Sequence, residues 1–306
     1  MATNNIKAIH PYDDPRVTHQ LQVVNGKNYH YVHGTPTGSV RGTFLCLHGF
    51  PDLWYGYRFM IPFLLERGFS AIVPDMLGYG RTDAPRVPPA DISTYSLKNH
   101  AADMVELLRI LDVQKVILFG HDWGAVVTSR IYLYNSEIVS HIANDPQTEK
   151  DTEAPGKVRQ FLKGLHRGRG GEQGDFMVDK DIVESIGDLK RSKFMTEEDL
   201  DYYTKEYGRS GFHGPLNWYK TRKVNYEDEK DLPFEGVKVP YLFLGARHDM
   251  AIRPFMAESQ KHLIPHLTTR HMDTAHWALV EDPETAIGHM SEWLDSVVLG
   301  GGESKI

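Results

Sequence analysis

The stretch FGHDWG, residues 119–124, lies between an apolar run (KVILF, 115–119) that predicts a buried strand and a pattern at 123–134 that predicts a helix. A polar residue between two small residues, at a strand-to-helix turn, is typical of a nucleophile elbow. Gly120 and Gly124 leave room for the backbone to fold back on itself, and the central residue is Asp122. Aspartate also tolerates left-handed backbone angles, so an ordinary turn that contains Asp is the alternative interpretation.

Strand and helix patterns alternate on both sides of this stretch. Helical periodicity runs through 97–111, and 123–134 and 287–298 are further predicted helices. Strands that alternate with helices predict a mostly parallel sheet that is covered by helices on both faces. The predicted strands are an opening hairpin at 20–24 and 29–33, followed by 43–47, 70–73, 115–119, 140–143, 240–244 and 268–272.

The alternation stops between residues 145 and 231. This part is charged, is punctuated by glycine, and has no convincing strand pattern. We interpret 145–231 as a helical lid inserted into a sheet domain made of 1–144 and 232–306, with lid helices predicted at 158–165, 196–207 and 216–224. The basic, Gly-rich segment 166–175 is interpreted as a lid loop, because a phosphate or RNA loop would need a strand before it and a helix after it.

Composition excludes several classes of protein. The 306 residues carry a net charge of −7, which does not favour nucleic acid or anionic membranes as partners. No apolar stretch approaches the roughly 18 residues of a membrane span, and we expect neither a cofactor nor a metal. The single Cys46 rules out an intrachain disulfide and fits a cytoplasmic location. The final residues 304–306 (Ser-Lys-Ile) differ by one conservative change from the peroxisomal address Ser-Lys-Leu, so a peroxisomal location stays open, as does the oligomeric state.

Three further loops after predicted strands supply polar groups. In the fold that such an elbow defines, the loop after the strand 43–47 provides one backbone N–H of an oxyanion hole, and the residue after the nucleophile provides the other. The amides of Phe50 and Trp123 are therefore the candidates. Asp249 and His276 each follow a predicted strand, and the order nucleophile, acid, base along the chain is the order expected for an α/β-hydrolase fold.

An aspartate nucleophile restricts the chemistry. Attack on an acyl carbon would give an anhydride, whereas attack on a saturated carbon gives an ordinary alkyl ester that water can open. His276 would activate this water and Asp249 would orient the imidazole. The substrates are thus epoxides or alkyl halides. Tyr219 could protonate the alkoxide of an opened epoxide, while a halide would need only an N–H donor such as Trp123, which therefore does not discriminate between the two.

These stretches resemble the soluble epoxide hydrolases of the α/β-hydrolase fold, of the fungal or microbial type. The resemblance implies that Asp122 is the nucleophile, Asp249 the charge-relay acid, His276 the base and Tyr219 a ring-opening acid. It also implies a cis peptide bond before Pro51 and a substrate pocket that includes Pro51, Trp54, Trp123 and Trp218. The matching stretches are HGFPDLW (48–54), PDMLGYGRTDAP (74–85), GHDWG (120–124), GFHGPLNWY (211–219) and LFLGARHD…HMDTAHWALVEDP (242–283).

The resemblance implies two lid tyrosines at the epoxide oxygen, and this sequence departs from that pattern. The early lid, 144–173, is short and contains no tyrosine. Tyr202, Tyr203 and Tyr207 lie on the helix that leads to GPLNWY, where we expect them to pack the lid. With Tyr219 as the single donor, we predict hydrolysis of a hydrophobic epoxide, with aryl epoxides preferred over alkyl epoxides. A dehalogenase with the same triad, and a binding protein with a remodelled lid, are the alternatives.

Overall fold

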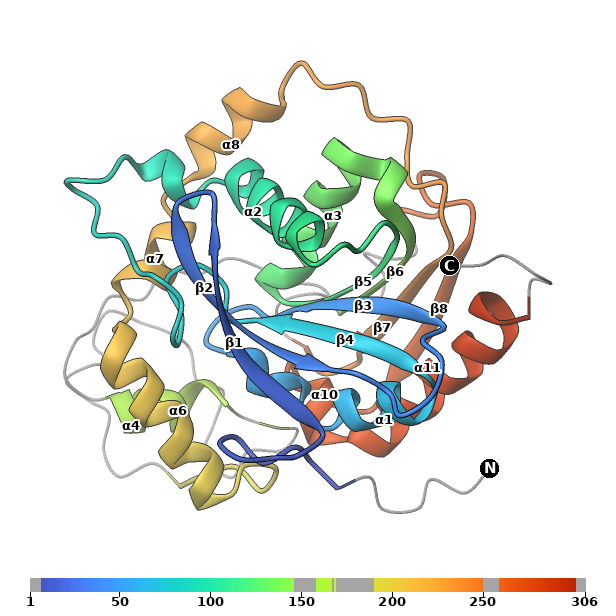
Figure 1. Ribbon diagram of the computed structural model, residues 1–306, viewed down its shortest axis with the longest axis horizontal. Coiled ribbons are helices and arrows are strands. Elements are labelled where there is room, and N and C mark those ends of the chain that lie inside the picture. The colour runs from blue at the N-terminus through green and yellow to red at the C-terminus, as the bar shows by residue number, and fades with distance from the viewer. Residues whose placement is uncertain (1–6, 146–157, 167, 169–189, 250–258, 301–306) are drawn as a thin grey trace.

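The computed structural model describes residues 7–145, 158–166, 168, 190–249 and 259–300. At its centre is an eight-stranded sheet with the order β1-β2-β4-β3-β5-β6-β7-β8 (Figure 1). The pairs β1–β2 and β2–β4 are antiparallel, and the pairs from β4–β3 to β7–β8 are parallel. The predicted mostly parallel sheet is therefore confirmed. The strands are β1 (Val17–Val24), β2 (Lys27–Gly34), β3 (Gly42–Leu47), β4 (Phe69–Pro74), β5 (Val116–His121), β6 (Val139–Asp145), β7 (Tyr241–Ala246) and β8 (Leu267–Met272).

Each of these strands coincides with a strand predicted from the sequence, with ends that differ by at most a few residues. The central strands β4 and β5 are buried at every position. A strand in the middle of a parallel sheet is covered on both faces, so its sequence is a continuous apolar run rather than an alternating one. Cys46 in β3 is fully buried, and burial raises the pKa of its thiol, so it packs as a small apolar residue.

Helices cover both faces of the sheet. In Figure 1, α2 (Leu97–Ile110) and α3 (Trp123–Asn135) lie on one face, and α1 (Met60–Glu66) and α11 (Pro283–Trp293) lie on the other. The helix predicted at 287–298 was wrong at its start, because Asp282 accepts a hydrogen bond from the amide of Thr285 and begins α11 earlier. The remaining short elements are η1 (Trp54–Tyr57), η2 (Ile92–Tyr95), η3 (Ser136–Ile138), α10 (Ala278–Glu281) and η4 (Leu294–Val298).

The described residues between β6 and β7 form helices beyond one end of the sheet (Figure 1). They are α4 (Val158–Leu165), α6 (Glu197–Ser210), α7 (His213–Trp218) and α8 (Arg222–Glu229). The single helix predicted over 216–224 was wrong: the hydroxyl of Thr221 donates to the carbonyl of Trp218 and closes a turn between α7 and α8. The division of the chain into a core and a lid at 145–231 stays a prediction. The loop predicted at 166–175 lies outside the described residues except for His166 and Gly168.

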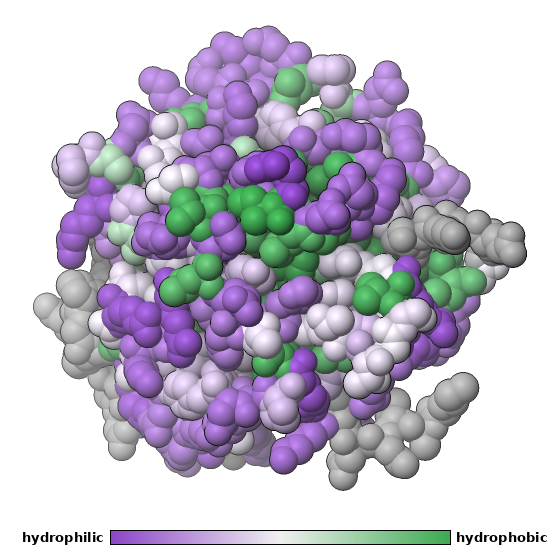
Figure 2. Space-filling model, viewed as in Figure 1, coloured by the Kyte–Doolittle hydropathy of each residue, from purple (hydrophilic) through white to green (hydrophobic). Residues whose placement is uncertain are grey.

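The surface viewed in Figure 2 is mainly hydrophilic, with hydrophobic side chains in patches between polar ones. Leu21 and Val23 of the edge strand β1 are among the exposed apolar residues. Within the described part of the chain, no helix has the length and apolar character needed to cross a membrane. The tail 304–306, with its resemblance to a peroxisomal address, lies outside the described residues.

Candidate active site

A tight elbow presents Asp122 between β5 and α3. Its backbone angles are φ 56° and ψ −128°. A Cβ added at Gly124 would lie 1.8 Å from the carbonyl oxygen of Leu47, and one added at Gly120 would lie 2.5 Å from the Cα of Ala125. Only glycine fits at these two positions, as the sequence pattern predicted. A non-glycine residue at a positive φ costs on the order of 1–3 kcal/mol, which the surrounding packing must offset.

The structure brings Asp122, Asp249 and His276 together at one edge of the sheet, where the neighbouring loops after β5, β7 and β8 meet. The Nε2 atom of His276 lies 3.5 Å from Oδ2 of Asp122. Its Nδ1 atom lies 3.1 Å from Oδ2 of Asp249. Both carboxylates are buried. The imidazole therefore connects two carboxylates that come from distant parts of the sequence.

The two carboxylates control the charge of His276. Burial alone lowers its pKa, because a charged imidazolium loses hydration. Hydrogen bonds and charge attraction from Asp122 and Asp249 outweigh this effect and raise the pKa of His276 well above its ordinary value. The two carboxylates therefore favour the charged imidazolium form of His276.

A backbone amide contacts the other oxygen of the Asp122 carboxylate. The N–H of Phe50 donates to Oδ1 of Asp122 at 2.5 Å, and the peptide bond from Phe50 to Pro51 is cis, as the resemblance implied. A Cβ added at Gly49 would lie 1.9 Å from the same oxygen, so the loop lies directly against the carboxylate. The amide of Trp123 is the first of α3, and the first amides of a helix have no acceptor within the helix.

Aromatic side chains pack around Phe50 and Trp123, the residues whose backbones flank Asp122. The ring of Tyr219, just after α7, packs edge-on against Trp123 at 5.0 Å and against Phe50 at 5.9 Å between ring centroids. Phe161 of α4 and Phe212 also pack against Phe50. These five side chains, which we call the aromatic wall, form a connected aromatic cluster next to Asp122.

The remaining candidates for substrate contact lie in different surroundings. The ring of Trp218 packs against that of Trp123, with 5.9 Å between the ring centroids, but its indole N–H donates to the carbonyl of Leu77. Trp54 is fully buried, and its indole N–H donates to the hydroxyl of Tyr202 at 2.6 Å. Trp54 thus lies at the contact between the sheet domain and α6, outside the aromatic wall. Pro51 is buried in the loop beside Phe50.

The tyrosines of α6 are hydrogen-bonded to the loop that carries Phe50. The hydroxyl of Tyr203 donates to the carboxylate of Asp52, and the hydroxyl of Tyr207 donates to the backbone carbonyl of Asp52 at 3.0 Å. These contacts agree with the packing role that the sequence suggested. The residue that receives both bonds, Asp52, was missed as a candidate, although it lies within the quoted HGFPDLW stretch.

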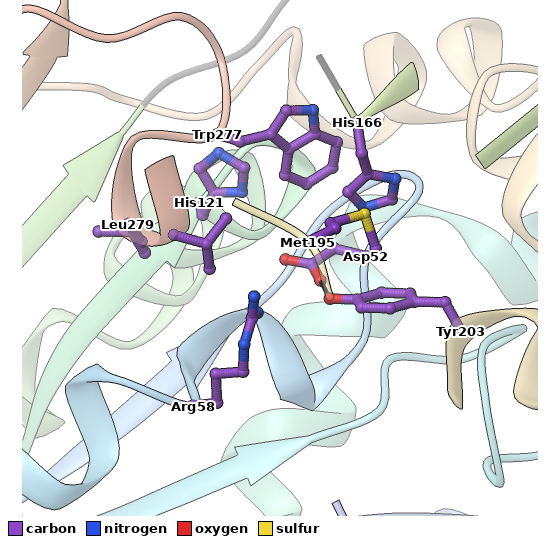
Figure 3. A pocket seen from close by; sticks show the side chains of 10 residues that line it. Asp52, Arg58, His121, His166, Met195, Tyr203, Trp277 and Leu279 are labelled. Atoms are coloured by element: carbon purple, nitrogen blue, oxygen red, sulfur yellow. Dashed lines mark hydrogen bonds between the residues drawn. The ribbon is translucent and has the colours of Figure 1, made fainter. Parts of the chain in front are cut away.

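Figure 3 shows the side chains that line a pocket near the candidate site. His121 and Trp277, the chain neighbours of Asp122 and His276, belong to its lining. His121 donates from Nε2 to the carbonyl of His276 at 3.0 Å, and the ring of His166 stacks on Trp277 at 4.1 Å. Sequence reasoning did not single out His121 or His166. The pocket is lined by Asp52, Gly56, Arg58, His121, His166, Met195, Tyr203, Trp277, Leu279 and Val280.

The fold defines the class of protein. A family model for the alpha/beta hydrolase fold matches residues 42–283, so the chain is an α/β-hydrolase. Within that class it belongs to the epoxide hydrolase family, since it is 32% identical to epoxide hydrolase srdG of Neurospora crassa over 94% of this chain and 98% of that protein. The family expected from the sequence motifs is therefore confirmed.

Other relatives agree with this assignment. The chain is 28% identical to bifunctional epoxide hydrolase 2 of Sus scrofa, with 87% of this chain aligned to 53% of that protein, so it spans about half of its length. The crystal structure of epoxide hydrolase VrEH1 from Vigna radiata superposes with a TM-score of 0.76 at 26% identity, covering 92% of this chain and 98% of that one. The alignment with the Neurospora crassa protein extends over 349 positions, more than the 306 residues here, so that relative has residues without a counterpart in this chain.

Proposed function

We propose that this chain hydrolyses an epoxide to a vicinal diol through a covalent ester on Asp122. The observation that carries the proposal is the surroundings of that carboxylate, with an amide donor 2.5 Å from one oxygen and an imidazole 3.5 Å from the other. A carboxylate in this position can displace an alkoxide from saturated carbon and form an alkyl ester. The relatives named as epoxide hydrolases support the choice of substrate.

In the first half of the reaction an oxygen of Asp122 attacks an epoxide carbon. A C–O bond to the enzyme forms while the C–O bond of the ring breaks, and Tyr219 gives its proton to the alkoxide that is released. The tyrosinate regains a proton from the imidazolium of His276 through solvent. The products are a hydroxyalkyl ester on Asp122 and a neutral imidazole.

In the second half the neutral His276 takes a proton from water, and the hydroxide attacks the carbonyl carbon of the ester. The amides of Phe50 and Trp123 stabilise the oxyanion, where each such donor is worth roughly 10²–10³ in rate. Collapse releases the diol and restores the Asp122 carboxylate. The proton taken from water stays on His276, so the resting imidazolium is restored and the proton count closes.

Ester formation itself prepares the second half of the reaction. The carboxylate of Asp122 is one of the two charges that hold His276 protonated, and the ester carries no charge. Alkylation therefore lowers the pKa of His276 at the moment when a neutral base is needed. Asp249 remains to orient the ring and to stabilise the imidazolium that forms again.

We infer a hydrophobic substrate from the aromatic wall. Aromatic rings offer apolar contact area and edge-to-face packing for another ring. With Tyr219 as a proton donor, an aryl epoxide such as styrene oxide should react faster than an unactivated alkyl epoxide, because the benzylic carbon carries part of the developing positive charge.

A second candidate is a haloalkane dehalogenase that uses the same triad. The indole N–H of Trp123, next to the nucleophile, is buried and has no hydrogen-bond partner among the described residues. Such a donor would suit a departing halide. Incubation with short bromoalkanes and measurement of bromide release tests this candidate, and bromide release without diol formation from any epoxide would favour it over the first proposal.

The main test is a single turnover of styrene oxide in ¹⁸O-labelled water. The first diol should carry an oxygen from the protein, and Asp122 should gain the label. His276→Gln should accumulate an adduct with the mass of the substrate, whereas the control His262→Gln, at an exposed histidine, should turn over normally. Solvent label in the first diol, or normal turnover by His276→Gln, would reject the covalent route.

A further inference from the structure

Tyr79 has a buried hydroxyl with nothing to bind. Its side chain is fully buried, and the hydroxyl has no hydrogen-bond partner among the described residues. Leaving such a group unsatisfied costs about 1–3 kcal/mol, so native proteins seldom retain one without a reason. Other buried tyrosines nearby are satisfied: the hydroxyls of Tyr203 and Tyr207 donate to Asp52, and that of Tyr202 accepts from Trp54.

The position of Tyr79 places it at the active site. It follows β4, which lies next to β3 in the sheet, and β3 lies next to β5, the strand that ends at the nucleophile elbow. Its ring packs edge-on against His48, in the loop of Phe50, at 4.9 Å, and against Trp218, the neighbour of Tyr219, at 5.8 Å. The phenol is therefore held between the loop that faces Asp122 and the helix that leads to Tyr219.

A backbone contact fixes this position. A Cβ added at Gly78 would lie 2.9 Å from the Cα of Gly214, so the loop of Tyr79 and the start of α7 touch without an intervening side chain. Burial raises the pKa of Tyr79 well above its ordinary value, and the nearby groups Tyr207, Tyr219 and Asp122 raise it further. The hydroxyl thus stays protonated and lies within electrostatic reach of both the nucleophile and Tyr219.

We propose that Tyr79 is a second catalytic hydrogen-bond donor to the epoxide oxygen. This inference rests on the proposed function. As the bond from Asp122 to carbon forms and the ring C–O bond breaks, Tyr219 transfers its proton to the oxygen and Tyr79 donates a hydrogen bond to it without losing its own proton. The bond to substrate satisfies the hydroxyl that is unpartnered in the free protein. The expectation of a single donor is thereby replaced by a pair, of which one member comes from the sheet domain.

The experiment follows the alkylation of the enzyme by styrene oxide in rapid-quench single turnovers, with the intact mass as the readout. The variants are Tyr79→Phe, Tyr219→Phe, the double variant, and Tyr95→Phe as the matched control. Tyr95 is also fully buried, but its hydroxyl donates to the carbonyl of Pro85 at 2.8 Å. Melting temperatures are measured for every variant in parallel.

Loss of one preorganised donor to a developing oxyanion costs roughly 10²- to 10³-fold, so Tyr79→Phe should alkylate at least about 100-fold more slowly than wild type. Hydrolysis of the preformed ester should change by less than about twofold. Because Phe removes an unsatisfied hydroxyl, the melting temperature should stay equal or rise, whereas Tyr95→Phe should melt lower and alkylate normally. Tyr219→Phe should keep a residual rate that the double variant loses.

Two results would overturn the proposal. One is a Tyr79→Phe variant that alkylates within twofold of wild type. The other is a slow Tyr79→Phe variant that also melts lower than Tyr95→Phe, which would mean that the hydroxyl supports the fold. Failure of the proposed function is a separate outcome, because wild-type protein would then form neither an adduct nor a diol from any epoxide.

Discussion

Replacing Asp122 by asparagine should lower the pKa of His276, because it removes one of the two charges that hold the imidazole protonated. Asparagine has nearly the same shape as aspartate, so the change removes the charge with little effect on packing. In the proposed mechanism the same neutralisation accompanies esterification of Asp122, so the variant imitates the electrostatic state of the proposed covalent intermediate.

The magnitude follows from the distance between the two groups. Nε2 of His276 and Oδ2 of Asp122 are 3.5 Å apart, and both side chains are mostly buried. At an effective dielectric constant of about 20, two unit charges at this separation attract by about 5 kcal/mol. Loss of this attraction favours the neutral imidazole, so the pKa of His276 falls when Asp122 loses its charge. Oδ2 of Asp249 lies 3.1 Å from Nδ1 of His276, and this carboxylate keeps its charge in the variant. It therefore limits the fall in the pKa of His276.

Nitrogen-15 NMR of the histidine rings between pH 4 and pH 10 measures the effect, with the resonances of His276 assigned from their loss in His276→Gln. Asp295→Asn is the control, since that carboxylate is exposed and paired with Arg67. In Asp295→Asn, His276 should titrate as it does in the wild type. An unchanged pKa of His276 in Asp122→Asn would show that Asp122 does not set the charge of the imidazole, and the proposed timing of the two half-reactions would be wrong.

Two further outcomes are expected. Gly49→Ala should slow alkylation at least tenfold, because its Cβ would overlap the carboxylate of Asp122. The control is Gly38→Ala, which should react at the wild-type rate because a Cβ there meets nothing within 4 Å. Equal rates for the two variants would contradict the close contact at Gly49. Burial, and then the charge of Lys27, lowers the pKa of His100 to about 3, below its value in the unfolded chain, so its contribution to stability is full above about pH 6.5 and is lost as the pH falls towards 3. Urea unfolding at pH 7 and at pH 5 tests this. Between these two pH values the free energy of unfolding should fall by about 2 kcal/mol more for the wild type than for His100→Phe. Equal falls in the two proteins would contradict the prediction.

The sequence predicted the sheet well because the hydrophobic pattern of each strand is local. Every strand of the described sheet was found, and the elbow at Asp122 was recognised from two glycines that the structure shows to be sterically required. The order of Asp122, Asp249 and His276 along the chain also fixed which loops should meet, since parallel strands end at the same edge of the sheet.

Features that depend on contacts between distant side chains could not be predicted. Nothing in the local sequence shows that the hydroxyl of Tyr79 lacks a partner, or that Asp52 accepts hydrogen bonds from α6. The break between α7 and α8 was missed for a different, local reason: the hydroxyl of Thr221 donates to the carbonyl of Trp218 three residues earlier, while the apolar spacing continues across the break. The high pKa of His276 likewise needs two carboxylates that only the fold brings together.

The bonds from Tyr203 and Tyr207 to Asp52 give two parts of the chain between β6 and β7 different evolutionary freedom. They tie α6 to the loop of Phe50, so a change of length before α6 leaves the groups around Asp122 in register. The stretch between β6 and α6, by contrast, supplies Phe161 to the aromatic wall. Insertions and deletions there should reshape the aromatic wall while leaving the groups around Asp122 in place. Laboratory evolution of a new substrate range should therefore begin in that stretch and leave the α6 anchor unchanged.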